Sequence, residues 1–486
     1  MPSASSAPSL LDTLASFVRR THPSDVPVGA RAAVCRRVLD TLGVSLGALP
    51  LDTSKAALRL GASWGGVPQA TAIGIATLLP APGAAFVNGT LAHSLDFDDT
   101  HLPSVLHPSA SLIPAMLAVG DAVDAHGSAA LAAAALGYEV CIRTGMAAYD
   151  RALGNSIFFE RGWHATSICG TLGAAALAAR LYDIESSDTP VGHAIAIAAS
   201  FGAGLLEGNR AGGSVKRLHC GWAAHGGIVA AQAAREGFTG PSSVFEGRFG
   251  FYEAFCGGRF DAAELTSSLG ERWVVEDIFY KPYPANHFTH GAIDAARRLR
   301  ERLQLQDRVD EIARIDLKAP TATLRTIAQP AEVKARPATG YQAQFSGPFA
   351  VAAAILGGGG LGLALEDFSD ANATDDRYRQ LMARVHCSAD AECDAIFPRQ
   401  FPAIVSVTMR DGRSYEERVM ANRGGPDWPL TDEELRVKFM SNATRAIEAG
   451  AARELADAIL ALDECPVREV TAVLRRAVRP VPGDRP

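Results

Sequence analysis

The segment from His93 to Ala110 gathers the side chains that most often carry acid–base chemistry. Its ionisable and hydroxyl groups are His93, Asp96, Asp98, Asp99, Thr100, His101 and His107. Alanine-rich, apolar sequence flanks it on both sides. Charged side chains avoid such surroundings unless they are paired or used in function. We therefore take this segment as the first candidate for a catalytic site.

Other segments place reactive side chains beside glycines or at expected helix starts. They are Arg161–Thr166 with His164, Gly212–His219 with Lys216, Lys281–Pro284, and Gln344–Ser346. Lysines and helix N-termini bind carboxylates, and glycines let the backbone approach a ligand closely. Histidines move protons near neutral pH. Together these parts indicate proton transfer next to a carboxylate without an organic cofactor.

Each of these residues also has a structural explanation. His107 and His164 stand where a helix is expected to begin, and Lys216 beside Arg217 fits a solvated pair of charges. Asp98 and Asp99 suit turns or helix ends. The functional interpretation therefore depends on the segments meeting in space.

Composition limits the partners that we expect. The 486 residues carry a net charge of -7, which opposes broad nucleic-acid binding. The longest weakly charged run, Val191–Leu206, is too short to cross a bilayer, so we expect no membrane partner. The eight cysteines are scattered, and no signal peptide is evident, which favours a cytoplasmic protein with reduced thiols.

Several motifs suggest other chemistry but lack the required context. Gly61–Gly65 matches a nucleophile elbow without a preceding strand, and Gly357–Gly362 follows a helix instead of a strand. We expect a loop and a helix stop there. The aspartates of the first segment could bind a hard cation, but no zinc spacing or calcium-loop pattern is present. We expect no metal and no cofactor.

The pattern of elements predicts a mainly α protein. Helical periodicity covers about 83–95, 108–124, 128–148, 164–182, 187–201 and 216–236. From Lys281 strands alternate with helices: strands at 313–318, 404–409 and 414–419, helices at 286–305, 343–356 and 375–386. Helices return at 431–447 and 450–462. We predict a large all-helical domain formed by both chain ends (1–280 and 425–486) and a smaller inserted α+β domain (281–424).

In several motifs the chain resembles the MmgE/PrpD family, which includes 2-methylcitrate dehydratase, cis-aconitate decarboxylase and iminodisuccinate epimerase. The matching pieces extend over nearly the whole chain. They are Leu39–Gly43, Asn88–Thr100, His107–Ser109, Gly162–His164, Gly213–Arg217, Lys281–Pro284 and Gln344–Ser346.

The resemblance implies a homodimer, cofactor-free chemistry and a helical domain over which the middle α+β domain closes as a lid. By motif match, the active-site positions are Asp96, Thr100, His107, His164, Lys216 and Lys281. We assign His107 and His164 to proton transfer. The lysines would hold substrate carboxylates, and Asp96 and Thr100 would orient a histidine or the substrate.

The leading prediction is a lyase that removes water from a small di- or tricarboxylic acid, as 2-methylcitrate dehydratase does. Decarboxylation, isomerisation or epimerisation of a dicarboxylate, and non-catalytic binding of acidic metabolites stay open as alternatives. Two departures count against a decarboxylase: the spacing from Thr100 to His107 is one residue longer than in those members, and Phe349 stands where they carry a tyrosine. A phenylalanine cannot donate a proton.

Overall fold

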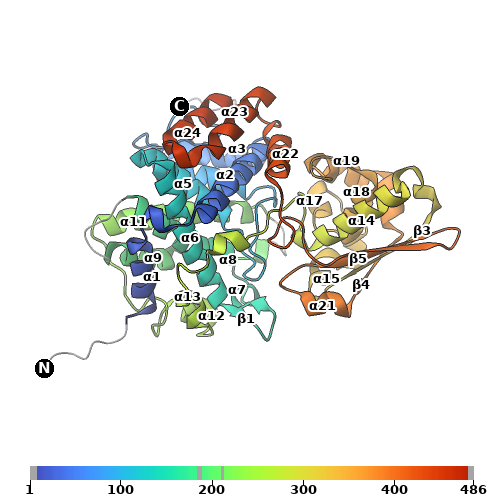
Figure 1. Ribbon diagram of the computed structural model, residues 1–486, viewed down its shortest axis with the longest axis horizontal. Coiled ribbons are helices and arrows are strands. Elements are labelled where there is room, and N and C mark those ends of the chain that lie inside the picture. The colour runs from blue at the N-terminus through green and yellow to red at the C-terminus, as the bar shows by residue number, and fades with distance from the viewer. Residues whose placement is uncertain (1–7, 183–188, 209–212, 480–486) are drawn as a thin grey trace. The chain divides into compact units, whose positions relative to one another are not determined.

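The computed structural model describes residues 8–182, 189–208 and 213–479, and it is mainly helical with two small sheets (Figure 1). The chain divides into two compact units. Met1–Ile278 together with Asn442–Pro486 form the first unit, and Phe279–Ser441 form the second unit. Within the described residues, no helix is both long enough and apolar enough to cross a membrane.

Helices from both ends of the chain build the first unit. Their bounds are α1 (Leu10–Arg20), α2 (Val28–Ala48), α3 (Asp52–Ser63), α4 (Ala81–Ala92), α5 (Ser109–Val123), α6 (Gly127–Ala147), α7 (Ile157–Glu160), α8 (Ala165–Leu181), α9 (Thr189–Phe201), α11 (Lys216–Arg235), α12 (Phe251–Cys256), α13 (Ala262–Thr266), α23 (Ala449–Leu460) and α24 (Val467–Ala477). The last of these was not expected from the sequence. α11 packs against α4, α8 and α9.

Glycines set how closely these helices approach each other. A Cβ added to Gly221 of α11 would lie 2.3 Å from the Phe86 carbonyl oxygen of α4. A Cβ added to Gly173 of α8 would lie 2.6 Å from the Gly137 carbonyl oxygen of α6. Since neither contact is sterically possible, these two crossings require glycine. They bring α11 close to α4 and α8 close to α6.

The first unit is not entirely helical, which corrects the prediction of an all-helical domain. β1 (Tyr149–Asp150) and β2 (Asn155–Ser156) pair as a short antiparallel hairpin. The Asp150 carboxylate accepts hydrogen bonds from the backbone N–H groups of Ala152 (2.9 Å) and Leu153 (3.2 Å). Gly154 has a φ of 61°, which few other residues adopt easily. These local interactions stabilise a turn where helical periodicity ends.

A four-stranded sheet organises the second unit. Its order is β4-β3-β5-β6, with β4 (Val385–Ala389) parallel to β3 (Ile312–Ala319) and with β5 (Ala403–Met409) antiparallel to β3 and to β6 (Ser414–Val419). The helices are α14 (His290–Leu303), α15 (Thr321–Ile327), α16 (Ala331–Lys334), α17 (Gly340–Ala343), α18 (Gly347–Leu356), α19 (Asp370–Thr374), α20 (Asp376–Met382), α21 (Ala391–Ile396) and most of α22 (Asp432–Ala443). α14 packs on β5 and β6, and α18 packs on α14 and β4.

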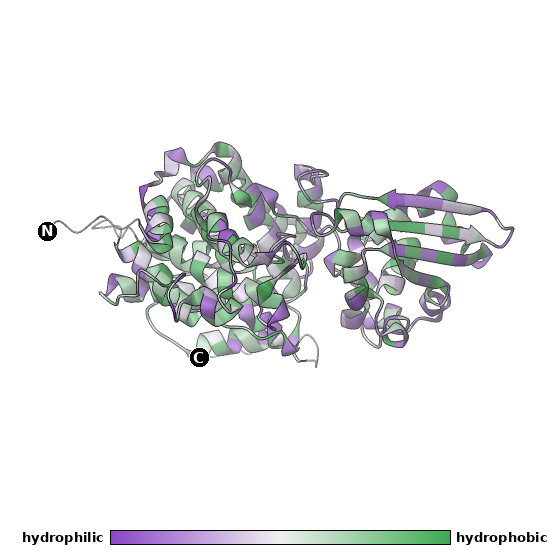
Figure 2. Cartoon of the chain, turned by 90° about the horizontal axis from the view of Figure 1, so that it is seen from below, coloured by the Kyte–Doolittle hydropathy of each residue, from purple (hydrophilic) through white to green (hydrophobic). Residues whose placement is uncertain are grey.

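The strands of this sheet carry hydrophilic and hydrophobic residues together, as their mixed colours show (Figure 2). The first two residues of β4, Val385 and His386, were expected to end a helix over 375–386. Val385 instead pairs with Ile315 of β3, so tertiary pairing decides its structure.

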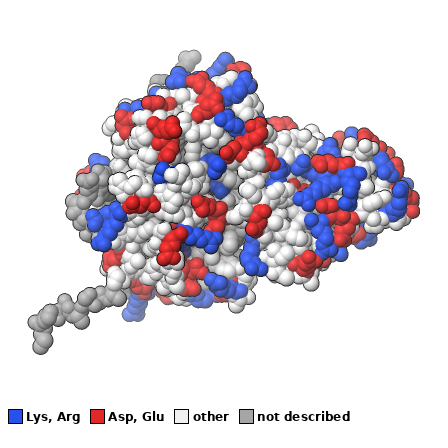
Figure 3. Space-filling model, viewed as in Figure 1, with Lys and Arg blue, Asp and Glu red and all other residues white. Residues whose placement is uncertain are grey.

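On the face drawn in Figure 3, basic and acidic side chains are interspersed.

The second boundary between the units lies at 441, whereas the sequence placed it at 424. Hydrogen bonds and ring contacts tie residues 424–434 to the second unit. The Gly424 carbonyl accepts from the Tyr280 N–H (2.9 Å), and the Arg298 guanidinium lies over the Trp428 ring. Arg423 forms an ion pair with Glu434 at 2.5 Å. A glycine-rich stretch is therefore not where the unit ends.

Candidate active site

The loop between α4 and α5 carries most of the candidate residues, and its own hydrogen bonds fix its path. His101 and Leu106 exchange backbone hydrogen bonds at 2.8 and 3.3 Å, which closes the loop on itself. Asp96 and Val105 take left-handed conformations, with φ of 52° and 54°. Asp99 accepts a hydrogen bond from the backbone N–H of Ser109, the first residue of α5 (3.3 Å). The loop is therefore anchored to the helix that follows it.

His107 is held in one tautomer by the backbone. Its Nδ1 lies 2.8 Å from the Asp99 carbonyl oxygen and 3.3 Å from the Thr100 hydroxyl. A carbonyl oxygen can only accept, so Nδ1 of His107 carries a proton. Its backbone N–H donates to the Thr166 hydroxyl of α8 (3.1 Å). In the neutral ring Nε2 is thus the atom that can accept a proton.

His93, at the C-terminal end of α4, lies between two other histidines. Its Nδ1 is 2.7 Å from the Asp98 carboxylate, and both side chains are buried. The ring centroids of His93 and His107 are 5.3 Å apart, and those of His93 and His164 are 5.5 Å apart. The three imidazoles therefore form a continuous cluster, buried at His93 and His164 and partly exposed at His107, which we call the histidine cluster.

His164 precedes α8 and meets His219 of α11. The two Nδ1 atoms are 2.9 Å apart. Burial is the largest cause that lowers the pKa of His164 well below its usual value, and the nearby His93 and Lys216 act in the same direction. Burial also lowers the pKa of His219 to about 4. Both imidazoles are neutral at pH 7.

Lys216, the first residue of α11, supplies positive charge to this region. Its Nζ lies 3.3 Å from the Asp96 carboxylate, and the two side chains are 17% and 7% exposed. The left-handed backbone of Asp96 turns its side chain out of the loop direction towards this contact. A partly exposed ammonium of this kind can bind a substrate carboxylate.

A second, fully buried ion pair supports the loop from α2. Arg37 lies 3.5 Å from Asp99, and their side chains are 3% and 1% exposed. The Ser109 hydroxyl donates a short hydrogen bond to Asp99 and also contacts the Tyr138 hydroxyl. Burial raises the pKa of Asp99 to about 6, although Arg37 and Ser109 oppose this change.

The structure brings five of the six predicted residues into the first unit. Asp96 contacts Lys216, Thr100 contacts His107, and His164 joins through the ring of His93. Lys281 belongs to the second unit, where it is buried with 1% exposure. The catalytic and binding roles given to these six residues stay predictions.

Sequence reasoning did not assign roles to His93, Asp98 or His219. His93 and Asp98 lie in the segment that first drew attention, and their spacing of five residues did not predict a contact across the end of a helix. His219 follows Lys216 by three residues on α11, so the two lie on one helix face. That spacing could have found it.

Phe349, which counted against a decarboxylase, is a core residue of the second unit. It is fully buried, and its ring lies 5.4 Å from that of Tyr378 and 5.5 Å from that of Phe368. A phenyl ring at this position is explained by packing within the second unit.

Among the residues that the structure describes, no group of three or more histidines, cysteines, aspartates or glutamates is placed to hold a metal ion.

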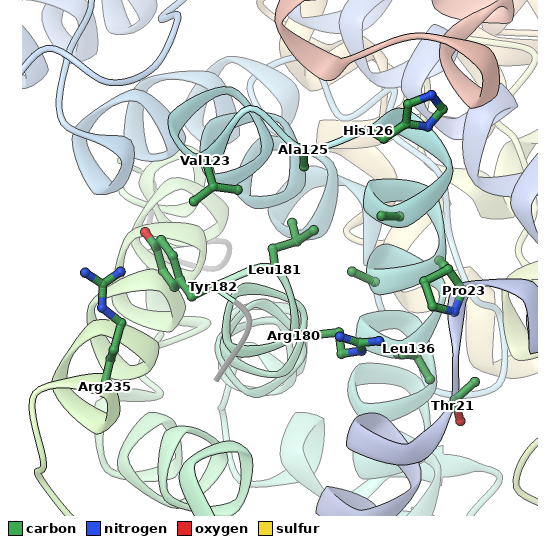
Figure 4. Close-up of a pocket in the computed structure, with 13 residues that line it drawn as sticks. Thr21, Pro23, Val123, Ala125, His126, Leu136, Arg180, Leu181, Tyr182 and Arg235 are labelled. Atoms are coloured by element: carbon green, nitrogen blue, oxygen red, sulfur yellow. The ribbon is translucent and has the colours of Figure 1, made fainter. Parts of the chain in front are cut away.

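A cavity of about 410 Å³ lies elsewhere in the first unit (Figure 4). None of the predicted site residues lines it. Val123, Leu181 and Arg235, the last residues of α5, α8 and α11, all border it. Arginines in the last turns of α8 and α11 match the partial negative charge of these helix ends. Helix termini therefore explain the arrangement of these residues around the cavity, and His126 and Tyr182 also line it.

Comparison with known proteins identifies the family. Residues 12–263 match the MmgE/PrpD N-terminal domain, and residues 283–464 match the MmgE/PrpD C-terminal domain. A cis-aconitate decarboxylase-like protein of Aspergillus oryzae is 26% identical over 95% of this chain and 96% of its own length. The cis-aconitate decarboxylases of Homo sapiens (29% identical, 85% of this chain and 83% of theirs) and Mus musculus (30%, 76% and 73%) are also similar. This chain belongs to the MmgE/PrpD family.

Proposed function

We propose that this protein is a decarboxylase that releases CO2 from cis-aconitate or a closely related unsaturated tricarboxylate. Its family and relatives make it a lyase that acts on a carboxylic acid. The relatives named above are cis-aconitate decarboxylases or similar to them. They favour decarboxylation, which the sequence analysis held as an alternative, over the dehydration that it put first.

Decarboxylation makes three demands on a protein. The carbon–carbon bond to one carboxylate breaks, CO2 leaves without the bonding electrons, and the electron pair remains on carbon. That carbon then takes up one proton, so one proton is consumed for each CO2 released. The site must therefore bind the remaining carboxylates, provide a proton at carbon, and limit access of water.

The histidine cluster beside Lys216 is the observation that carries the proposal. The imidazoles of His93 and His164 are buried, and that of His107 is 12% exposed. Their contacts give proton-transfer groups in a region with little access to water. Lys216 offers an ammonium to the substrate carboxylates, and Asp96 positions it. Nε2 of His107 is the atom we assign to proton transfer, because the Asp99 carbonyl holds its other nitrogen. This Nε2 takes up one proton from solvent before the reaction and gives it to the carbon after CO2 has left, so the ring returns to its neutral form. Thr100 then orients this ring.

The test is to incubate the purified protein with cis-aconitate, citrate and 2-methylcitrate in separate reactions. We expect CO2 release in equal amount to the loss of cis-aconitate, and none from the other two acids. Formation of an alkene from citrate or 2-methylcitrate without CO2 would instead identify a dehydratase. Solvent deuterium entering an otherwise unchanged acid would identify an isomerase or epimerase.

Matched variants connect the activity to the site. His107→Gln removes the proton-transfer group while it keeps similar bulk, and we expect CO2 release to fall with it. We also propose that the reaction needs no cofactor, so activity should survive dialysis against a chelator. Lys281→Met tests the predicted role of Lys281 in carboxylate binding, which should increase KM when the ammonium is lost.

We further propose that the chain forms a homodimer through the outer face of α11. Three apolar side chains at the start of this helix are unusually exposed, namely Val215 (47%), Leu218 (37%) and Trp222 (47%). Aromatic and aliphatic groups gathered on one face are typical of protein interfaces. Light scattering after size exclusion should give twice the mass of one chain. Trp222→Glu should shift the measured mass towards that of a single chain.

A further inference from the structure

The contact between His164 and His219 permits only one proton between their two Nδ1 atoms. Their Nδ1 atoms are 2.9 Å apart. Two protonated Nδ1 atoms would place hydrogens against each other, and two bare ones would oppose their lone pairs. One ring donates and the other accepts, so the tautomer of either histidine sets the tautomer of its partner.

The two possible states leave His164 with opposite properties. When His219 donates, Nδ1 of His164 is bare and its Nε2 carries the proton, ready to donate. When His164 donates, its Nε2 keeps a lone pair and can only accept. Among the described residues, Nε2 of His164 has no hydrogen-bond partner of its own. It is therefore available to a ligand.

The neighbouring rings and chain hold this pair in place. The Ser167 hydroxyl, one turn into α8, donates to the His219 carbonyl at 3.0 Å. A Cβ added to Gly204 would lie 3.2 Å from Cβ of His164 and 3.4 Å from Nδ1 of His219. An added side chain at Gly204 would therefore make a tight contact with the β-carbon of His164 and an ordinary contact with the imidazole of His219. The contact thus belongs to a closely packed arrangement and not to two mobile surface groups.

The charges around the pair favour an anionic ligand and a neutral imidazole. His164 precedes the N-terminus of α8, and Lys216 lies one helical turn before His219. Burial, His93, His107 and Lys216 all oppose a positive charge on His164 and lower its pKa, so it does not become an imidazolium near pH 7. A carboxylate bound beside Lys216 would repel a bare Nε2 and would be stabilised by an N–H there.

We propose that His219 is a positioning residue that keeps the proton of His164 on Nε2, so that His164 acts as a neutral hydrogen-bond donor to a substrate carboxylate. This inference rests on the proposed function only for the identity of the anion. It leaves proton transfer to His107 alone, whereas the sequence analysis gave that role to both His107 and His164. A neutral histidine with a depressed pKa at a helix N-terminus is suited to polarise a substrate.

A direct test reads the tautomer without turnover. The full chain, labelled with nitrogen-15 in its histidines, is examined by NMR at pH 7 with saturating tricarballylate, a saturated tricarboxylate that cannot lose CO2 in this way. Signals are assigned with His164→Gln and His219→Asn. We expect His164 to be protonated at Nε2 and His219 at Nδ1. A proton on Nδ1 of His164 would overturn the proposal, as would tricarballylate leaving every histidine signal unchanged.

A kinetic test uses two substitutions at His219. The amide of His219→Asn can still donate near the position of Nδ1, whereas His219→Leu cannot. We expect His219→Leu to lower kcat on the order of 100-fold, which is the scale for losing one preorganised hydrogen-bond donor. In His219→Asn most of the wild-type kcat should be retained. Equal kcat values for the two variants, whether both high or both low, would refute the positioning role.

The two tests also separate this inference from the proposed function. If no carboxylic acid is turned over but His164 is protonated at Nε2 with tricarballylate bound, the decarboxylase proposal fails and the positioning role stands. If His219→Leu decarboxylates cis-aconitate at the normal rate, the positioning role fails and the decarboxylase proposal stands. Should the leucine variant not fold, the asparagine variant and the NMR measurement still decide.

Discussion

Removal of Arg37 should destabilise the protein in a way that depends on pH. Arg37 lies 3.5 Å from Asp99, donates to the Ile278 carbonyl at 2.5 Å, and is almost completely buried. In Arg37→Met the Asp99 carboxylate loses the cation that compensates its burial. Breaking a buried pair from one side costs about 3–5 kcal/mol of folding free energy. We expect a loss of this size at pH 8.

The pKa of Asp99 gives the sign of the pH dependence. Burial raises this pKa from 3.8 to about 6 in the native protein, so the native state holds this proton more tightly than the unfolded chain. The stability that comes from this proton is fully present below pH 3.8 and is lost as the pH rises through about 6. A difference of this size between the pKa values of the native and unfolded states corresponds to about 3 kcal/mol.

In Arg37→Met, the loss of folding stability with rising pH should continue to higher pH than in the wild type. Arg37 lowers the pKa of Asp99, so its removal raises that pKa further. Above pH 6 the variant then loses up to about 1.4 kcal/mol per pH unit relative to the wild type. The interval from pH 6 to pH 8 gives up to about 2.7 kcal/mol, which accounts for most of the loss expected at pH 8.

Urea unfolding of the full chain at pH 5, 6, 7 and 8 measures this difference. The control is Arg151→Met, which removes an arginine that is 78% exposed and 2.7 Å from Glu264, and which should change stability by less than about 0.5 kcal/mol at every pH. Arg37→Met combined with Asp99→Asn should remove the pH dependence. An equal loss for Arg37→Met at pH 5 and pH 8 would show that Asp99 is not the titrating group.

Three further predictions concern the site and the helices around it. His107→Gln should lower kcat on the order of 100-fold or more at nearly constant KM, and a rate close to wild type would remove its proton-transfer role. Lys216→Met should chiefly raise KM, since it binds a carboxylate in ground and transition states alike; an unchanged KM would place this ammonium outside the site. Gly221→Ala should destabilise the crossing of α4 and α11 by about 1–3 kcal/mol, with Gly450→Ala, where an added Cβ meets nothing within 4 Å, as the control in thermal unfolding.

The sequence predicts the helices of the first unit well because their periodicity and their stop signals agree. α5, α6, α8 and α11 begin and end within one residue of their expected ranges. Leu356 ends α18 just before the glycine run, as expected. The sequence fails where a contact distant along the chain decides the structure. β4 is a strand because it pairs with β3, and no local pattern carries that information.

The sequence predicted which segments carry the candidate site residues, but it did not predict which of these residues pair with each other. The density of ionisable groups in an apolar context pointed to the loop from His93 to Ser109, where the structure buries most of these groups together. It could not show that Asp98 pairs with His93, or that Asp99 pairs with Arg37 across 62 residues. Sequence spacing constrains contacts within one helix, whereas these pairs depend on how α2, α4 and α5 pack.

The neutral state of His164 and His219 determines how the site can attract an anion. A cluster of buried imidazoles cannot all be charged, because each ring opposes the charge of the next, and burial lowers the pKa of both His164 and His219. Attraction for a tricarboxylate must therefore come from the Lys216 ammonium and from N–H donors. His164 and His219 are then left to direct hydrogen bonds, and His107 is left to move protons. A lysine paired with Asp96 and histidines with separate roles thus divide substrate binding and proton transfer between different groups, and this division is why we expect Lys216→Met to act on KM and His107→Gln on kcat.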